Sequence, residues 1–199
     1  MTNGESGDDS AESVPMTREQ YLCLMEWLNG TLAAHATAAR TVASAGFKRL
    51  PLYFPRETLE SAMFVVVDPL PIPPFSKWGL NQFQSFGTGD YGGITFLNTF
   101  FIKGERAVEE RLHFHELIHV VQWRLLGAEG FVTAYALGFA SYGYRKSPLE
   151  VMAYDAEEAF AQSLDPFDAE KQAADQLRKM RLLPQLPPGQ RRRDGGTPL

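Results

Sequence analysis

Residues 113–123, HFHELIHVVQW, contain the pattern HExxH, which places His115, Glu116 and His119 at fixed spacing. Residues four apart on an α-helix lie about 40° apart around the axis and about 6 Å apart along it, so the two imidazoles point the same way and can bind one ion. Glu116 is rotated about 100° from His115, which leaves its carboxylate beside such an ion, where a general base is needed. The stretch therefore predicts a helix that carries a zinc site.

The same residues could instead form a helix that is packed on both sides, with its histidines satisfied by hydrogen bonds. Burying two imidazoles and a carboxylate among aliphatic side chains is costly without a compensating partner, and a cation is the obvious one. We therefore favour the metal site. His113 lies about 200° around the helix from His115 and cannot share that ion, so we expect it to be a packing or surface residue.

A catalytic zinc site needs three protein ligands and one open position, so a third ligand must come from another segment. Residues 147–160, SPLEVMAYDAEEAF, offer Glu150, with Glu157 two turns further on nearly the same face and Asp155 close to it. One acid could bind the metal while another orients a ligating histidine. Glu150 could also form a capping box with Ser147. Spacing alone does not choose among these acids, and we favour Glu150 over Glu157.

The helix of the HExxH pattern is predicted over about 105–127, ending at Gly127, because glycine commonly follows the last helical residue. Residues 128–146, AEGFVTAYALGFASYGYRK, then form a second predicted helix. Its end carries side chains that could donate to a developing oxyanion, although residues at a helix end more often only pack. These candidates are Tyr142, Tyr144 and Arg145.

The chain before the HExxH pattern predicts helical and strand segments in turn. A capping box and apolar residues at helical spacing predict a helix over about 17–45 that can break near Gly30. The β-branched run 63–67 predicts a buried strand, the proline-rich segment 68–78 a rigid connector, and 93–102 a tight hairpin or one kinked strand. We therefore expect an α+β domain, mostly helical, with a small β-sheet packed on the HExxH helix.

Composition sets the limits of this domain. The chain has 199 residues, of which 44% are hydrophobic, and we expect one folded domain over residues 16–183. Residues 1–15 form an acidic segment and 184–199 a segment rich in proline, arginine and glycine. Both offer too little apolar surface to offset the entropy of ordering, so we expect disordered tails.

Charge and leader signals narrow the partners and the compartment. The formal net charge of −5 argues against nucleic acid and against an anionic membrane as partners. No signal-peptide pattern and no run of about 18 apolar residues is present. The single cysteine, Cys23, excludes an internal disulfide and suits a reducing compartment. These observations predict a cytoplasmic protein.

Three stretches together resemble the bacterial HELxHxxQ metallopeptidases, a zincin-like group of the gluzincin type: ITFLNTFFI at 94–102, HELIHVVQW at 115–123 and SPLEVMAY at 147–154. The resemblance extends over about residues 50–160. It implies a zincin-like fold in which His115 and His119 bind Zn²⁺ and Glu116 is the catalytic base.

The segment 148–157, of the form PLExxAYxxE, also resembles the third-ligand helix of gluzincins related to the Mlc titration factor. This resemblance implies that Glu150 is the third zinc ligand. Many such sequences carry another acid two positions later, where this chain has Met152. The departure puts a role for that second acid in doubt and leaves Glu150 as the matching ligand.

The function expected from these residues is hydrolysis of peptide bonds in a protein or peptide substrate by a zinc-activated water, with Glu116 as general base. An edge strand of the 93–102 hairpin could hold an extended substrate. The alternative is a non-catalytic zinc-binding scaffold or effector-associated module, and an HExxH hydrolase of a non-peptide bond is a third possibility. Three protein ligands would indicate an enzyme and a fourth would indicate a scaffold.

Overall fold

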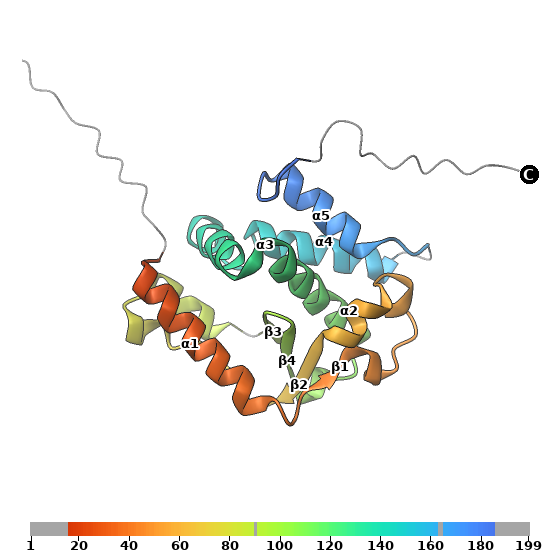
Figure 1. Ribbon diagram of the computed structural model, residues 1–199, viewed down its shortest axis with the longest axis horizontal. Coiled ribbons are helices and arrows are strands. Elements are labelled where there is room, and N and C mark those ends of the chain that lie inside the picture. The colour runs from red at the N-terminus through yellow and green to blue at the C-terminus, as the bar shows by residue number, and fades with distance from the viewer. Residues whose placement is uncertain (1–15, 90, 163–164, 186–199) are drawn as a thin grey trace, which may run out of the picture.

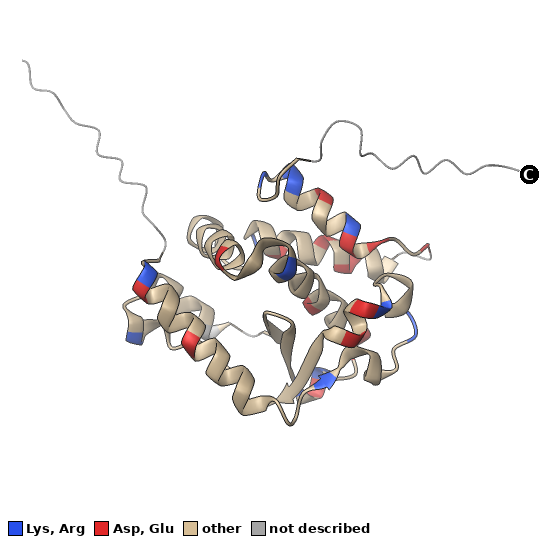
Figure 2. Ribbon diagram, in the orientation of Figure 1, with Lys and Arg blue, Asp and Glu red and all other residues tan. Residues whose placement is uncertain are grey.

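The computed structural model describes residues 16–89, 91–162 and 165–185, which form an α+β fold with helices around one small sheet (Figure 1). The tails predicted at 1–15 and 184–199 lie outside the described residues, apart from Pro184 and Gln185. Charged residues occur mainly on the helices and turns, and the strands in the middle of the view carry few (Figure 2). No helix among the described residues has the length and apolar character needed to cross a bilayer.

The sheet has four strands, β1 (Arg40–Thr41), β2 (Met63–Val67), β3 (Gly93–Phe96) and β4 (Thr99–Lys103), in the order β1-β2-β4-β3. β2 and β4 are parallel, and the two outer pairs are antiparallel. The strand predicted at 63–67 is confirmed, and 93–102 is a hairpin and not one kinked strand. The two-residue strand β1 was not predicted. Because β3 is last in the strand order, it lies at an edge of the sheet.

The first helix, α1 (Arg18–His35), begins at the predicted capping box, in which the backbone N–H of Gln20 donates to Thr17 Oγ1 over 3.2 Å. The prediction that it continues to residue 45 was wrong. After His35 the chain turns into β1, because Arg40 and Thr41 pair with β2, and Thr41 then caps a short 3-10 turn. Helical spacing alone could not show that this strand pairing would end the helix.

A short helix, α2 (Arg56–Ser61), precedes β2, and the segment between β2 and β3 has no long helix or strand of its own. The predicted connector at 68–78 ends in a 3-10 helix, η3 (Phe75–Trp78), and a second one, η4 (Asn81–Thr88), follows; neither was predicted. They lie beside α1 in the structure, as Gln20 Nε2 donates to the carbonyl of Trp78 over 2.9 Å.

The long helix α3 (Glu110–Tyr142) contains two segments, because Gly127 has non-helical dihedral angles (φ 68°, ψ 170°). The predicted end of the HExxH helix at Gly127 is thus confirmed, but the helix begins later than residue 105, after the 3-10 turn η5 (Gly104–Arg106). α4 (Pro148–Gln162) follows as predicted. α5 (Ala169–Lys179) was missed, although Asp168 caps it.

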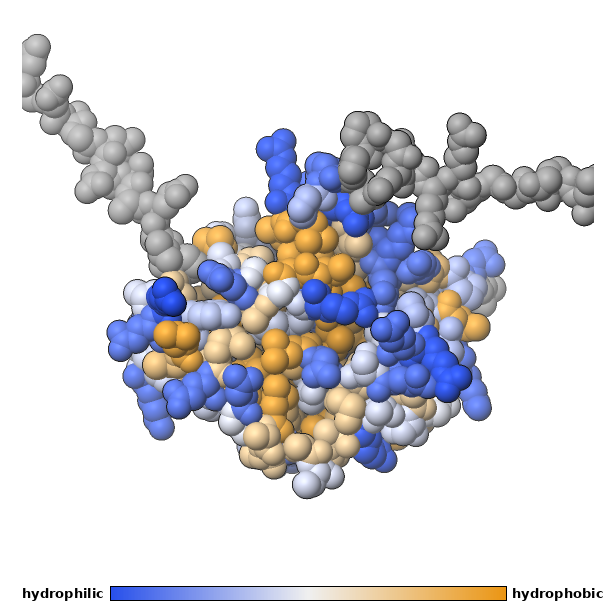
Figure 3. Space-filling model, in the orientation of Figure 1, coloured by the Kyte–Doolittle hydropathy of each residue, from blue (hydrophilic) through white to orange (hydrophobic). Residues whose placement is uncertain are grey.

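The first segment of α3 lies in the centre of the molecule, against β3 and β4 on one side and α4 and α5 on the other (Figure 1). Most of its apolar side chains are almost fully buried, among them Phe114, Leu117, Ile118 and Val121. Apolar side chains also reach the surface in the middle of the view, over α3 and the sheet (Figure 3). This arrangement puts the HExxH residues inside the fold, between a sheet edge and a helix.

Candidate metal centre

Two helices bring three potential metal ligands together. His115 and His119 lie on the first segment of α3, and Glu150 lies in the first turn of α4; all three are buried. The Nε2 atoms of the two histidines are 3.2 Å apart. The Glu150 carboxylate lies 3.5 Å from His115 Nε2 through Oε2 and 3.4 Å from His119 Nε2 through Oε1. The three side chains thus converge on one point.

The spacing of these atoms fits a small divalent cation. A tetrahedral ion about 2.1 Å from each ligand keeps its ligands about 3.4 Å apart. The two Nε2 atoms are close to that separation, and each of them has one oxygen of the Glu150 carboxylate at a similar distance. Glu150 Oε2 is buried and has no hydrogen-bond partner, which is unfavourable unless a cation neutralises it. Two histidines and one carboxylate are also a donor set that zinc uses in catalytic sites. The residues present therefore fit a zinc ion with one position left open.

The outer nitrogen of His115 is held by a second acid on α4. His115 Nδ1 lies 2.9 Å from Glu157 Oε2, and because a carboxylate only accepts, the ring nitrogen must donate. Arg111 binds the other oxygen of Glu157 over 2.5 Å. The proton on Nδ1 leaves the Nε2 lone pair of His115 directed into the cluster. Glu157 therefore lies outside the ligand cluster and orients a ligand.

Gln122 holds His119 in the same way. His119 Nδ1 donates to Gln122 Oε1 over 2.8 Å, and the amide nitrogen of Gln122 donates in turn to the carbonyl of Leu149 over 3.0 Å. Two neutral histidines held like this direct two lone pairs at each other beside a carboxylate, so either a proton or a metal ion must lie between them. The Gln122 contact also ties α3 to the start of α4, which carries Glu150.

Glu150 is oriented by the second segment of α3, where Tyr135 Oη donates to Glu150 Oε1 over 2.7 Å. The alternative in which Glu150 completes a capping box with Ser147 does not occur, because Ser147 Oγ has no hydrogen-bond partner and the Glu150 carboxylate points at the histidines. Glu150 thus faces the cluster, although its position at the start of α4 allowed both roles.

Glu116 lies beside the three ligands, buried between α3 and β3. Its Oε2 accepts a hydrogen bond from Thr95 Oγ1 over 2.6 Å, and burial raises the pKa of its carboxyl group. The carboxylate can approach the strand this closely because Gly93 has no side chain: a Cβ there would lie 2.5 Å from Glu116 Oε1. The sheet edge thus helps to fix the position of Glu116, while its burial raises its proton affinity.

The other predicted residues divide into two groups. Asp155 is exposed on α4, away from the ligand cluster, and Tyr142 is 62% exposed at the end of α3. Tyr144 lines the cavities beside Glu116. Arg145 lines the polar cavity and places its guanidinium 4.8 Å from the ring centre of Tyr154. Of the three predicted oxyanion donors, only Tyr144 and Arg145 therefore border the site.

His113 has the packing role predicted for it. Its Nε2 lies 2.9 Å from the carbonyl of Ala107, and its ring packs against Phe47, Phe64 and Phe100. Burial lowers the pKa of this histidine, so it is neutral at pH 7. His113 belongs to the core between α3 and the sheet and not to the cluster.

Some residues that shape the site were not found from the sequence. Gln122 follows His119 by three positions, so helical geometry would have placed it on the same face. Thr95 and Tyr135 come from a strand and from a helix segment beyond the Gly127 break. Their contacts with Glu116 and Glu150 depend on tertiary packing and left no local signal.

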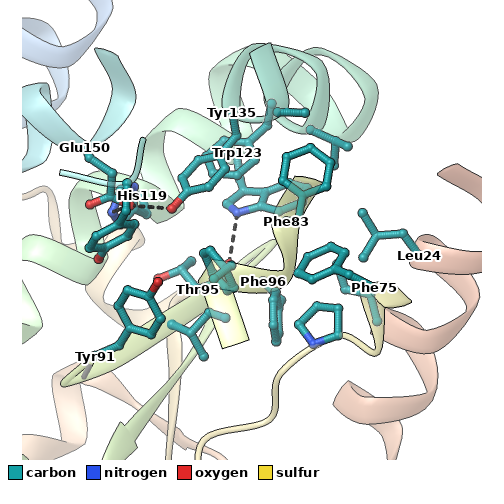
Figure 4. A pocket seen from close by; sticks show the side chains of 18 of the residues that line it. Leu24, Phe75, Phe83, Tyr91, Thr95, Phe96, His119, Trp123, Tyr135 and Glu150 are labelled. Carbon is teal, nitrogen blue, oxygen red and sulfur yellow. Dashed lines mark hydrogen bonds and ion pairs between the residues drawn. The ribbon is translucent and has the colours of Figure 1, made fainter. Parts of the chain in front are cut away.

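Two cavities adjoin the cluster, and Glu116 and Tyr144 border both. One is polar and lies on the His115 side, where it is lined by Arg145 and Glu157. The other is apolar and extends from His119 and Glu150 towards α1 (Figure 4). The cluster is therefore buried in the fold but reachable from open space on two sides.

No protein-family model, no curated protein and no solved structure matches this chain. What is known of the protein therefore comes from its own structure. The structure shows an α+β fold and a buried His-His-Glu cluster with a second glutamate beside it.

Proposed function

We propose that this protein is a zinc-dependent metallopeptidase with a zincin-like fold of the gluzincin type. In this proposal His115, His119 and Glu150 bind zinc, Glu116 is the general base, and the substrate is a peptide or protein in the cytoplasm. The observation that carries it is the triangle formed by His115 Nε2, His119 Nε2 and the Glu150 carboxylate, with the Glu116 carboxylate beside it. The likeness to the HELxHxxQ metallopeptidases supports the same assignment.

The residues around the triangle are suited to hydrolysis. Zinc held there would supply Lewis acidity, which polarises a carbonyl oxygen and makes a water molecule easier to deprotonate. Thr95 holds Oε2 of Glu116 and leaves Oε1 to take the proton of the attacking water. Because burial raises the pKa of Glu116, the carboxyl group keeps that proton long enough to pass it to the leaving amine.

The edge strand β3 supports binding of an extended peptide. The N–H of Lys103 donates to the carbonyl of Gly92, so in the antiparallel register with β4 the backbone groups of Gly93 point away from β4. The next carbonyl on that side, of Thr95, already accepts from Trp123 Nε1 over 3.2 Å. Gly93 lies against Glu116, so a substrate strand paired there would pass the site. Tyr144 lines both cavities beside Glu116, and in this proposal it donates to the oxyanion.

The competing function is a non-catalytic zinc scaffold, which needs a fourth protein ligand in place of the open position. Across residues 16–89, 91–162 and 165–185, the one group of metal-binding side chains at this point has three members, His115, His119 and Glu150. Glu157 and Glu116 are engaged by His115 and Thr95. This coordination favours the enzyme.

The test compares zinc content and hydrolysis of a peptide library by the wild type, Glu116→Gln and the surface control Glu26→Gln. Glu116→Gln keeps the shape of the side chain but cannot take a proton, so we expect zinc to stay bound and kcat to fall about 10²- to 10⁴-fold. Glu26 is exposed on α1, and its variant should match the wild type.

Two results would contradict the proposal. A wild type that holds one zinc and cleaves no member of the library would support the scaffold. A protein that binds no zinc, even when the ion is added in excess, would remove both functions.

A further inference from the structure

The apolar cavity beside the cluster has no part in the hydrolytic steps above. It has a volume of about 100 Å³, and three parts of the chain that are distant in sequence form its walls. His119 and Glu150 lie at one end, and Leu24 of α1 and Phe75 of η3 lie at the other (Figure 4). A ligand that occupies it would therefore touch the metal site.

The walls of the cavity are built for an apolar occupant. Trp123 and Phe131 stack with their ring centres 4.0 Å apart, and Phe83 lies across from them (Figure 4). The one polar atom of the indole is already used, because Trp123 Nε1 donates to the carbonyl of Thr95 over 3.2 Å. A water molecule needs two to four polar partners, which these walls do not offer away from the metal ligands.

The size of the cavity selects among apolar groups. A cavity of about 150 Å³ in another protein holds a benzene molecule, and this one, at about 100 Å³, is smaller and better suits a branched aliphatic chain. The polar cavity on the His115 side is lined by Arg145 and Glu157 and would not favour such a group. Of the two cavities beside the cluster in the described part of the chain, the apolar one is therefore the better site for an aliphatic group.

We propose that this cavity is the specificity pocket of the enzyme and receives a leucine-sized aliphatic side chain next to the scissile peptide bond. This inference rests on the proposed function, since it assumes that a substrate carbonyl lies at the metal. It names the substrate class as peptides with leucine or isoleucine beside the cleaved bond, in preference to tryptophan, phenylalanine or a charged residue.

The test measures binding of two hydroxamates to the zinc-loaded protein by calorimetry. Acetohydroxamate reaches the metal alone, whereas isovalerohydroxamate carries three more carbons that can enter the pocket. Each buried methylene raises affinity about fourfold, so we expect isovalerohydroxamate to bind about 60-fold more tightly. Peptides with leucine beside the cleaved bond should show the same preference over their tryptophan counterparts in kcat/KM.

Matched variants locate the effect. Ala136 is buried in the pocket wall and Ala140 is exposed one turn further along α3. Ala136→Leu fills the pocket and should reduce the preference to less than about fivefold, with zinc content and acetohydroxamate binding unchanged, while Ala140→Leu should keep it. Phe83→Leu enlarges the pocket and should move the preference towards phenylacetohydroxamate. This second variant keeps the test decisive if the first fails to fold.

The outcomes separate this inference from the proposed function. Equal affinity for both hydroxamates in a zinc-loaded wild type would overturn the pocket and leave the zinc site standing. A preference that both alanine variants retain would also overturn it. If neither hydroxamate binds because the protein holds no zinc, both the proposed function and this inference are wrong.

Discussion

His115 lies between two carboxylates, and this determines its protonation when the site holds no metal. Burial lowers the pKa of His115, but the contacts with Glu150 and Glu157 outweigh burial and raise the pKa to about 10. The metal-free site at neutral pH therefore holds a proton where the two Nε2 lone pairs meet. A zinc ion must take the place of that proton.

Zinc affinity should consequently rise with pH. Between pH 7 and 9 the free protein carries the extra proton and the zinc-bound protein does not, so the association constant should increase about tenfold per pH unit and level off near pH 10. Calorimetry in buffers of different ionisation enthalpy should show release of at least one proton. Glu157→Gln removes one of the groups that raise the pKa and should release fewer protons. Binding without proton release would show that His115 is neutral.

At the scale of elements, the break in α3 at Gly127 shapes the site. Its dihedral angles (φ 68°, ψ 170°) lie in a region that is almost restricted to glycine. The break redirects the second segment, so that Tyr135 reaches Glu150 and Ala136 lines the apolar pocket. One straight helix could not present His119 and Tyr135 to the same acid.

Gly127→Ala should therefore lower the free energy of unfolding by about 1–3 kcal/mol, since alanine is strained in this conformation. Gly30→Ala is the matched control: Gly30 lies inside α1 with open space around it, so the same substitution should raise the free energy of unfolding by up to about 1 kcal/mol. Urea denaturation measures both values. A Gly127→Ala protein as stable as the wild type would show that the break does not need glycine.

At the scale of the whole molecule, the candidate metal site draws its residues from two consecutive helices. His115 and His119 come from α3 and Glu150 from α4, and α4 has its largest contact with α3. A zinc ion bound by all three would hold the helices together in the folded state only. Zinc binding should therefore be linked to global stability.

At free zinc about 100 times its Kd, binding adds about 2.7 kcal/mol to the free energy of unfolding. For a chain of this size, each kcal/mol shifts Tm by about 2–4 °C, so removal of zinc by a chelator should lower Tm by about 5–11 °C. Glu150→Gln preserves the shape of the side chain but loses its charge and should show a much smaller shift. Equal shifts in both proteins would place the zinc elsewhere.

The parts of the fold that could be predicted are those set by neighbours along the chain. The spacing of His115 and His119, the β-branched strand β2 and the glycine break at the end of the HExxH helix are local patterns, and the structure contains each of them. β1 has two residues and is defined by its pairing with β2, so no pattern in the sequence predicts it. The missed α5 does carry a signal, since Ala169, Ala173 and Leu177 recur at helical spacing.

The candidate site divides in the same way. Helical geometry by itself determined that two imidazoles share a face with a glutamate beside them, because dihedral angles over one turn decide it. Tertiary structure alone decided which acid completes the triangle, since Glu150 and Glu157 lie on nearly the same face of α4 and only its packing against α3 points one at Nε2 and the other at Nδ1. It likewise brought Thr95 to Glu116 and closed the apolar pocket, because contacts between distant segments depend on how whole elements pack.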